Sequence, residues 1–147
     1  MVEQINKSLD ILLVEDNEGD IVLTMEALAE VTLNNPVSVA RDGEQALAFL
    51  KKEAPYEDTV MPNLILLDIN LPRVDGIEVL LFIKKHPALK RIPVIMLTTS
   101  NSKNDINEAY SNHANFYITK PVDLDSFFAL VQSIQLHWTS VIKLPAD

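Results

Sequence analysis

The stretch from Pro62 to Gly76 reads PNLILLDINLPRVDG, and it decides the fold expected for this chain. Four apolar residues run without a break from Leu64 to Leu67, and Asp68 follows at once. An uninterrupted apolar run of this length is typical of a parallel strand that is covered on both faces. A charged residue directly after a buried strand therefore needs an explanation, and the rest of the chain supplies one.

Four other short apolar segments resemble this run, and longer segments with helical spacing separate them. The other expected strands cover residues 11–14, 36–40, 93–97 and 116–118. The expected helices cover residues 20–31, a segment opened by 42–44, residues 76–85, a polar segment from 102 to about 113, and a last segment capped by Asp123. In the first helix the expected apolar stripe consists of Ile21, Met25, Leu28 and Ala29. This alternation predicts five βα units in a doubly wound parallel sheet with helices on both faces.

Length and composition limit the class of protein. A chain of 147 residues with 48% hydrophobic residues suits one domain with one sizeable core. The net charge of −9 argues against direct nucleic-acid binding, because phosphate contacts need clustered Lys and Arg. No stretch is long and apolar enough to span a membrane, and the N-terminal segment lacks signal-peptide features. The absence of cysteine excludes disulfides and thiolate metal sites, and we expect a cytoplasmic protein.

Polar residues follow four of the five expected strands. Glu15 and Asp16 follow the first strand, Asp68 the third, Thr98 ends the fourth, and Lys120 follows the fifth. Taken singly, each has an ordinary interpretation as a helix cap or a loop residue. Because ligands of such sheets bind beyond the carboxyl ends of the strands, the joint placement predicts a functional site.

The residue types indicate the chemistry of that site. Three carboxylates repel one another, and a divalent cation removes the repulsion. Mg²⁺ prefers oxygen ligands and keeps waters and phosphate oxygens in its shell, and the Asn70 backbone carbonyl can add a ligand. Lys120 and Thr98 can hold a phosphoryl oxygen. Asp68 can then act as a nucleophile that forms an acyl phosphate.

Four motifs in chain order resemble those of receiver domains of two-component response regulators. They are ILLVEDN at 11–17, ILLDINLPRVDG at 65–76, PVIMLTTS at 93–100 and YITKP at 117–121. The resemblance spans about residues 10–138. It implies a flavodoxin-like sheet of order 2-1-3-4-5 and one receiver domain over residues 1–147. The roughly 30 residues after the last expected strand suit one helix and a short C-terminal extension, which is too little for a separate output domain.

The resemblance also implies a role for each residue that matches the motifs. Asp68 corresponds to the phospho-acceptor, and Lys120 to the phosphate-binding lysine. Mg²⁺ is expected to be bound by Glu15, Asp16, Asp68 and the backbone carbonyl of Asn70. In the family the acid at position 16 usually ligates directly, whereas the acid at position 15 often acts through water.

A conformational switch is implied by the same resemblance. Thr98 corresponds to the switch hydroxyl, which moves toward the phosphoryl group, and Tyr117 to the switch aromatic, which then turns inward. Without the resemblance Tyr117 is a plain strand residue. Pro121 corresponds to a cis-proline that aims the lysine. Thr99 stands where the family commonly has Ala or Gly, and its larger side chain is expected to slow dephosphorylation.

Two further segments resemble the single-domain response regulators that pair with cyanobacterial phytochromes. One is the loop EAPYEDTVM at 53–61, which reads as a solvated excursion and is either a tolerated insertion or a partner contact. The other is the C-terminal extension. The resemblance implies a histidine kinase, and within this group a phytochrome, as the phosphoryl donor.

The last helix carries more apolar residues than one core face needs. Phe127, Val131, Ile134 and Trp138 share a face that is expected to join the core. Leu124, Phe128 and Leu130 flank that face and predict a homodimer formed by the last two helices and the fifth strand. The alternative is that the tail after residue 138 folds back over these residues.

The resemblance favours a phosphorylation-driven switch that is not a dedicated enzyme but assists its own phosphorylation and dephosphorylation. A haloacid dehalogenase-type phosphatase is a rival, but it needs an acid two residues after the nucleophile, where this chain has Asn70. A flavodoxin needs a hydroxyl-rich phosphate loop where this chain has Glu15 and Asp16. A phosphorylation-independent interaction module remains open.

Overall fold

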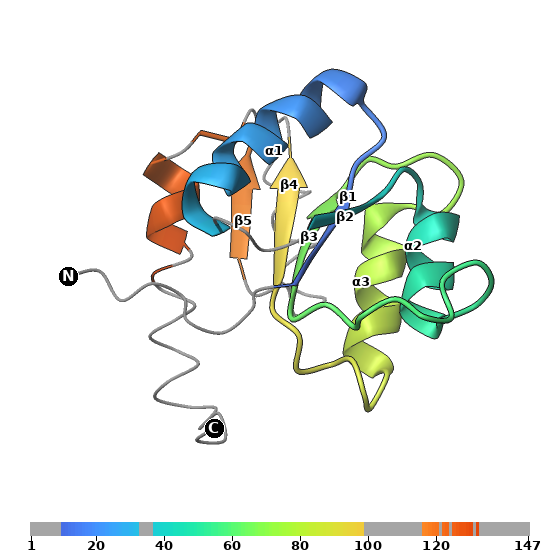
Figure 1. Ribbon diagram of the computed structural model, residues 1–147. Coiled ribbons are helices and arrows are strands. Elements are labelled where there is room, and N and C mark those ends of the chain that lie inside the picture. Colours follow the sequence, from blue (N-terminus) through green and yellow to red (C-terminus); the bar gives the residue numbers. More distant parts are fainter. Residues whose placement is uncertain are drawn as a thin grey trace, which may run out of the picture.

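A five-stranded parallel sheet forms the centre of the molecule (Figure 1). The computed structural model describes residues 10–32, 37–98, 116–120, 122–123, 125–130 and 132. The strands are β1 (Ile11–Val14), β2 (Val37–Ala40), β3 (Leu64–Asp68), β4 (Val94–Thr98) and β5 (Phe116–Thr119). Their order is β2-β1-β3-β4-β5, and all four neighbouring pairs are parallel. The expected fold class and strand order are therefore confirmed.

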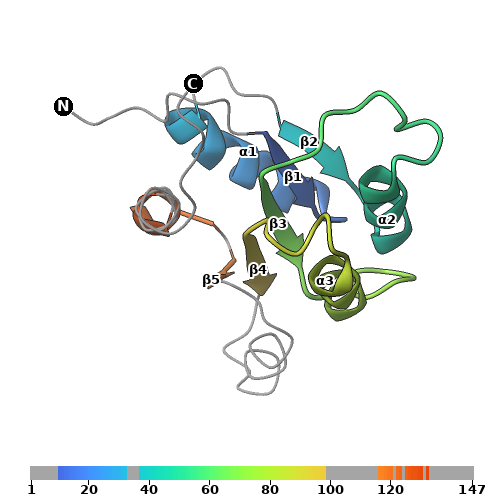
Figure 2. The ribbon, with the colours of Figure 1, turned by 90° about the horizontal axis from the view of Figure 1, so that it is seen from below.

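Helices cover both faces of the sheet (Figures 1 and 2). The helices α2 (Gly43–Lys51) and α3 (Gly76–Lys85) lie on one face, here called the α2/α3 face. Helix α1 (Glu18–Thr32) and the helical residues 125–130 lie on the other, here called the α1 face. Among the described helices none is long and apolar enough to cross a membrane. The expected helix from 102 to about 113 lies outside the described residues.

The buried strands divide their side chains between two core clusters. Leu12, Val14, Ile65 and Leu67 belong to the cluster on the α2/α3 face. Ile11, Leu13, Leu64 and Leu66 belong to the cluster on the α1 face. Because successive side chains of a strand point to opposite faces, every residue of these runs enters one core or the other. This explains why the runs are apolar without interruption.

Helix α1 buries a slightly different stripe from the one expected. Ile21 and Leu28 are buried as predicted, but Ala29 is exposed and Ala27 is buried in its place. Thr24 is also buried. The buried face is centred near Thr24 and Leu28, so it passes over Ala27 and leaves Ala29 outside. The expectation for Ala29 was wrong because helical spacing alone does not fix the rotation of a helix about its axis.

Local capping explains where α2 and α3 begin. Asp42 caps α2 by accepting a hydrogen bond from the Gln45 N–H at 2.7 Å. Asp75 caps α3 by accepting from the Ile77 N–H at 2.7 Å, and its own N–H donates to Glu78 Oε1 at 3.3 Å. Side chains of this kind satisfy the backbone N–H groups that the first turn leaves without partners.

The loop between β3 and α3 is clamped by two glycines. A Cβ atom on Gly76 would lie 2.1 Å from the carbonyl oxygen of Asp68, and the Gly76 N–H donates to the Ile69 carbonyl at 3.0 Å. A Cβ atom on Gly43 would lie 2.0 Å from the Val74 carbonyl oxygen. Neither position has room for a methyl group, so the loop after Asp68 lies directly against the starts of α3 and α2.

The loop at 53–61 is only partly a solvated excursion. The Tyr56 ring packs against Phe49, with ring centroids 5.4 Å apart, and its backbone N–H donates to the Glu53 carbonyl. Lys52 Nζ donates to the Thr59 carbonyl. Val60 is 65% exposed. The loop is thus anchored to the α2 side by one aromatic residue, while its acidic residues remain at the surface.

We expect Gly76→Ala to lower the free energy of unfolding by about 2 kcal/mol, because the new methyl group collides with the backbone of Asp68. Urea unfolding measures this change. The control is Gly19→Ala in the exposed first turn of α1, where the nearest atom is Asn17 Oδ1 at 3.3 Å. That change is expected to alter stability by no more than about 1 kcal/mol, because only the end of the exposed Asn17 side chain has to move. Equal free energies of unfolding for the two variants would contradict the close contact between Gly76 and the Asp68 backbone.

Candidate functional site

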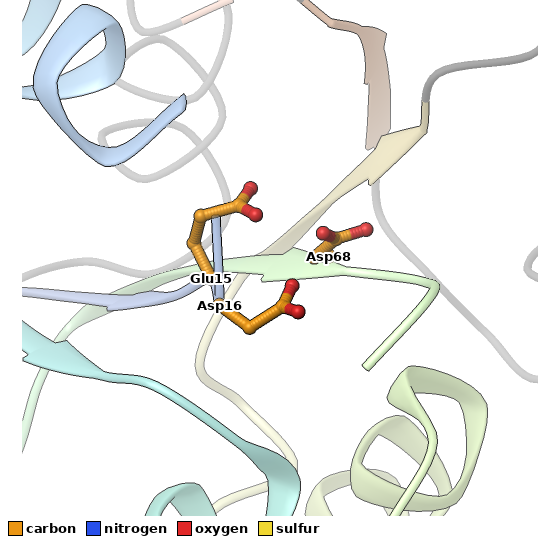
Figure 3. A group of neighbouring side chains, drawn as sticks. All are labelled: Glu15, Asp16 and Asp68. Carbon is orange, nitrogen blue, oxygen red and sulfur yellow. The ribbon is translucent and has the colours of Figure 1, made fainter. Parts of the chain in front are cut away.

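The three predicted acidic residues, Glu15, Asp16 and Asp68, lie at the position in the sheet where the strand order reverses. From β1 the chain goes to β2 on one side, and it then crosses back to β3 on the other side of β1. Glu15 and Asp16 follow β1, and Asp68 ends β3. Figure 3 shows their carboxylates together beyond the carboxyl ends of these two strands. This switch point is where ligands of doubly wound sheets bind.

Glu15, Asp16 and Asp68 form a tight group, here called the carboxylate cluster. One oxygen from each lies within 4.8 Å of the others. Glu15 and Asp68 are buried, whereas Asp16 is exposed. The Asn17 N–H donates to Glu15 Oε2 at 3.1 Å, and the Asn70 N–H donates to Asp68 Oδ1 at 3.0 Å. The backbone beyond each strand therefore fixes the orientation of the two buried carboxylates.

Lys120 joins this cluster from the end of β5. Its Nζ atom donates to Glu15 Oε1 at 3.0 Å, to Asp68 Oδ2 at 2.9 Å and to Asp20 Oδ2 at 2.9 Å. The Lys120 side chain is 5% exposed. The predicted convergence of Lys120 on the acidic residues is thus present. Asp20 was not expected at the site, because an acidic residue in the first turn of a helix is usually explained by the helix dipole alone.

Burial and ion pairing set the charge of the buried groups. Burial raises the pKa of Glu15 to about 7, although its hydrogen bond with Lys120 opposes the rise. Burial alone would lower the pKa of Lys120, but hydrogen bonds with Asp20, Asp68 and Glu15 together raise it above its ordinary value. The ammonium therefore stays charged, while Glu15 changes its charge near neutral pH.

The donor set of the carboxylate cluster fits a hard divalent cation. Three carboxylates supply the oxygen ligands that Mg²⁺ and similar ions prefer, and the exposed Asp16 leaves one side open to solvent. Together with Asp20 the site holds four carboxylates against one ammonium. A divalent cation would reduce this excess of negative charge. The Asn70 carbonyl stays a predicted ligand.

Thr98 and Tyr117 lie on one face of the sheet. Thr98 is fully buried at the end of β4, and the Lys120 N–H donates to its carbonyl at 2.6 Å. Tyr117 pairs with Met96 and packs, half-buried, against the α2/α3 core. Because Thr98 is two residues from Met96 on β4, its side chain points to the same face. The arrangement is consistent with a coupled pair, and the switch itself stays a prediction.

Only part of the predicted dimer surface falls on described residues. Phe127 is fully buried and Phe128 is 38% exposed, as expected. Leu130 differs from the expectation, because it is half-buried and packs against the core on the α1 face. Leu124 lies outside the described residues, as do Thr99, Pro121 and the tail. Phe128 is therefore the one described member of the predicted surface that is exposed.

Comparisons with known proteins extend the similarity over nearly the whole chain. The family model described as "Response regulator receiver domain" matches residues 11–132, a range that contains every site residue from Glu15 to Lys120. Response regulator Rcp1 of Synechocystis sp. is 45% identical over 146 residues, 99% of each chain. The crystal structure of the phosphorylated cyanobacterial phytochrome response regulator RcpA is 47% identical with a TM-score of 0.78, covering 95% of this chain and 100% of RcpA. The Mn²⁺-bound form of Rcp1 is 47% identical with a TM-score of 0.75, covering 93% and 99% of the two chains.

The raised pKa of Glu15 predicts a pH dependence of stability for the cation-free protein. In the unfolded chain Glu15 ionises near its ordinary pKa of 4.5, whereas in the folded chain it holds its proton to about pH 7. Between these values the folded state binds the extra proton, so rising pH removes stability. The free energy of unfolding of wild type minus that of Glu15→Gln should therefore fall by on the order of 2 kcal/mol from about pH 5 to about pH 8.

Urea unfolding in the presence of a chelator measures this difference at each pH. Glu26→Gln on the exposed side of α1 is the control, because it makes the same change of side chain outside the carboxylate cluster. A wild-type advantage over Glu15→Gln that grows with pH would show that the proton is not retained by Glu15.

Proposed function

Because the chain belongs to the response regulator receiver domain family, we propose that it is a response regulator activated by phosphorylation of Asp68. The observation that carries the proposal is the contact of 2.9 Å between Lys120 Nζ and Asp68 Oδ2 inside the carboxylate cluster. This contact joins a candidate nucleophile to a cation that can hold a phosphoryl oxygen. A buried strand supports the nucleophile from behind, so its position is rigid.

The reaction follows from the positions of these groups. A carboxylate oxygen of Asp68 forms a bond to the phosphorus of a donor phosphohistidine, while the N–P bond breaks and its electron pair leaves with the imidazole nitrogen. Lys120 offsets negative charge on the transferred group. Mg²⁺, when bound by Glu15, Asp16, Asp68 and the Asn70 carbonyl, would supply further charge stabilisation. The protein in this way assists its own phosphorylation and dephosphorylation, without being a dedicated enzyme.

A switch made of Thr98 and Tyr117 is the proposed output of this reaction. Thr98 is buried at the end of β4, beside the strand that carries Asp68. A move of its hydroxyl toward the phosphoryl group would leave space on the α2/α3 face. Tyr117 is half-buried on that face and can turn into the space. The surface over β4 and β5 would then differ between the two states.

The proposed phosphoryl donor is a histidine kinase, and within that class a phytochrome. The support is the similarity to RcpA, which is itself a cyanobacterial phytochrome response regulator. The similarity to the Mn²⁺-bound form of Rcp1 supports a divalent cation at the cluster. A phosphatase of the haloacid dehalogenase type gains no support, because position 70 is an asparagine.

We expect acetyl phosphate to phosphorylate wild type in the presence of Mg²⁺, and a beryllium fluoride adduct to bind it under the same conditions. Both results should disappear in Asp68→Ala and when the cation is removed, because the acceptor or its charge balance is then missing. Mass spectrometry measures the phosphoryl group. Asp58→Ala, in the exposed loop at 53–61, is the matched control and should behave as wild type. Modification that persists in Asp68→Ala would place the acceptor elsewhere, and no modification of wild type would favour a phosphorylation-independent module.

The homodimer expected from the sequence is also part of the proposal. Phe128 is 38% exposed on the helical residues 125–130, next to the fully buried Phe127. The proposed interface is formed by the last two helices and the fifth strand, and Phe128 is the residue of the described part of the last helix at which it can be tested.

We expect light scattering to show a dimer for wild type and a monomer for Phe128→Asp, because a charge at the interface opposes burial. Both proteins are measured with and without beryllium fluoride and Mg²⁺. Val60→Asp is the matched control, because Val60 is also exposed but lies in the loop at 53–61. A monomeric wild type in both states would remove the dimer from the proposal.

A further inference from the structure

Asp20 is the partner of Lys120 that the proposed function does not use. Its Oδ2 atom lies 2.9 Å from Lys120 Nζ, the same distance as that of Asp68 Oδ2. Asp20 does not belong to the carboxylate cluster. Its side chain is 26% exposed, whereas that of Glu15 is completely buried. Lys120 therefore joins two buried carboxylates to a third one that is closer to solvent.

Both oxygens of each buried carboxylate already have a donor. Glu15 accepts from the Asn17 N–H through Oε2 and from Lys120 through Oε1. Asp68 accepts from the Asn70 N–H through Oδ1 and from Lys120 through Oδ2. If the carboxylate cluster binds a divalent cation, these oxygens must be shared with the lysine. Repulsion between the two positive charges then weakens the bonds of Lys120 to Glu15 and Asp68.

Lys120 needs another acceptor when these two bonds weaken. Its side chain is 5% exposed, so water offers little replacement, and an ammonium without partners is costly to bury. Asp20 supplies an acceptor outside the carboxylate cluster, for which the cation does not compete directly.

The first turn of α1 holds Asp20 in place. The Asp20 N–H donates to Asn17 Oδ1 at 2.9 Å, and the Ile21 N–H donates to the Asn17 carbonyl at 2.9 Å. A carboxylate in the first turn of a helix also interacts favourably with the helix dipole. Asp20 is thus a fixed acceptor on a helix, whereas Glu15 directly follows β1 and Asp68 ends β3.

We propose that Asp20 is a positioning residue for Lys120, which retains the ammonium beside the carboxylate cluster while Glu15 and Asp68 bind a divalent cation. The lysine then remains in reach of a phosphoryl group on Asp68. This last step rests on the proposed function, but the retention of the lysine concerns cation binding alone. The two can therefore be tested separately.

The test is a double-mutant cycle read by calorimetric titration with Mg²⁺. Asp20→Asn should weaken Mg²⁺ binding about tenfold, because Lys120 then depends on the same carboxylates as the cation. In a Lys120→Met background, Asp20→Asn should change the affinity by less than about twofold, because no ammonium is left to retain. Glu18→Gln, in the same helical turn, removes the same charge without touching Lys120 and should leave the affinity within about twofold of wild type.

Two results would overturn the positioning role. Equal weakening by Asp20→Asn in both backgrounds would mean that Asp20 attracts the cation directly, and unchanged affinity in Asp20→Asn would mean that the lysine does not depend on it. Circular dichroism checks folding, and Lys120→Gln serves as the background if Lys120→Met does not fold. Phosphorylation of wild type by acetyl phosphate is measured in parallel. Coupling without phosphorylation supports retention of the lysine and overturns the proposed function, whereas phosphorylation without coupling does the reverse.

Discussion

The ion pairs of Lys120 are the interaction on which the rest of the site depends. One buried ammonium contacts Glu15 after β1, Asp68 at the end of β3 and Asp20 in α1, and these partners are 52 to 105 residues away in the chain. Removing one member of such a buried group leaves charges that are costly to keep out of water. The ends of β1, β3 and β5 are therefore held together by charge as well as by the sheet. This makes the site part of the fold rather than an addition to it.

Ion pairs hold the Asp68 side chain, and close packing of the starts of α3 and α2 constrains the backbone of Asp68 and of the loop that follows it. Gly76 lies against the Asp68 carbonyl, and Gly43 lies against the Val74 carbonyl. Because neither contact leaves room for a methyl group, the starts of α3 and α2 are positioned by the loop after Asp68. Densely packed interiors transmit small displacements. A displacement of the Asp68 backbone would therefore be transmitted to the start of α3, and to β4 through the strand pairing.

Charge balance connects the structure to its proposed chemistry. Four carboxylates and one ammonium leave the site strongly negative, and burial raises the pKa of Glu15 to about 7. A cation-free site therefore destabilises its own ionised form. A divalent cation and a phosphoryl group bring charges of opposite sign, so each makes the other more favourable at the same place. The same excess of carboxylate is what makes an acceptor outside the cluster, such as Asp20, useful to the lysine.

The sequence by itself was enough to predict the parallel sheet and the residues that meet at its edge. The order of the strands followed from the resemblance to receiver domains. Apolar runs such as Leu64–Leu67 are local signals, and parallel strands bring their carboxyl ends to one side, so Glu15, Asp68 and Lys120 were expected together. Only the tertiary structure decided the contact of Asp20 with Lys120, the burial of Ala27 in place of Ala29, and the packing of Leu130. Those features depend on how each helix is rotated about its own axis over the sheet. Residue spacing shows which residues share a helix face, but it does not decide which of the residues flanking that face are buried.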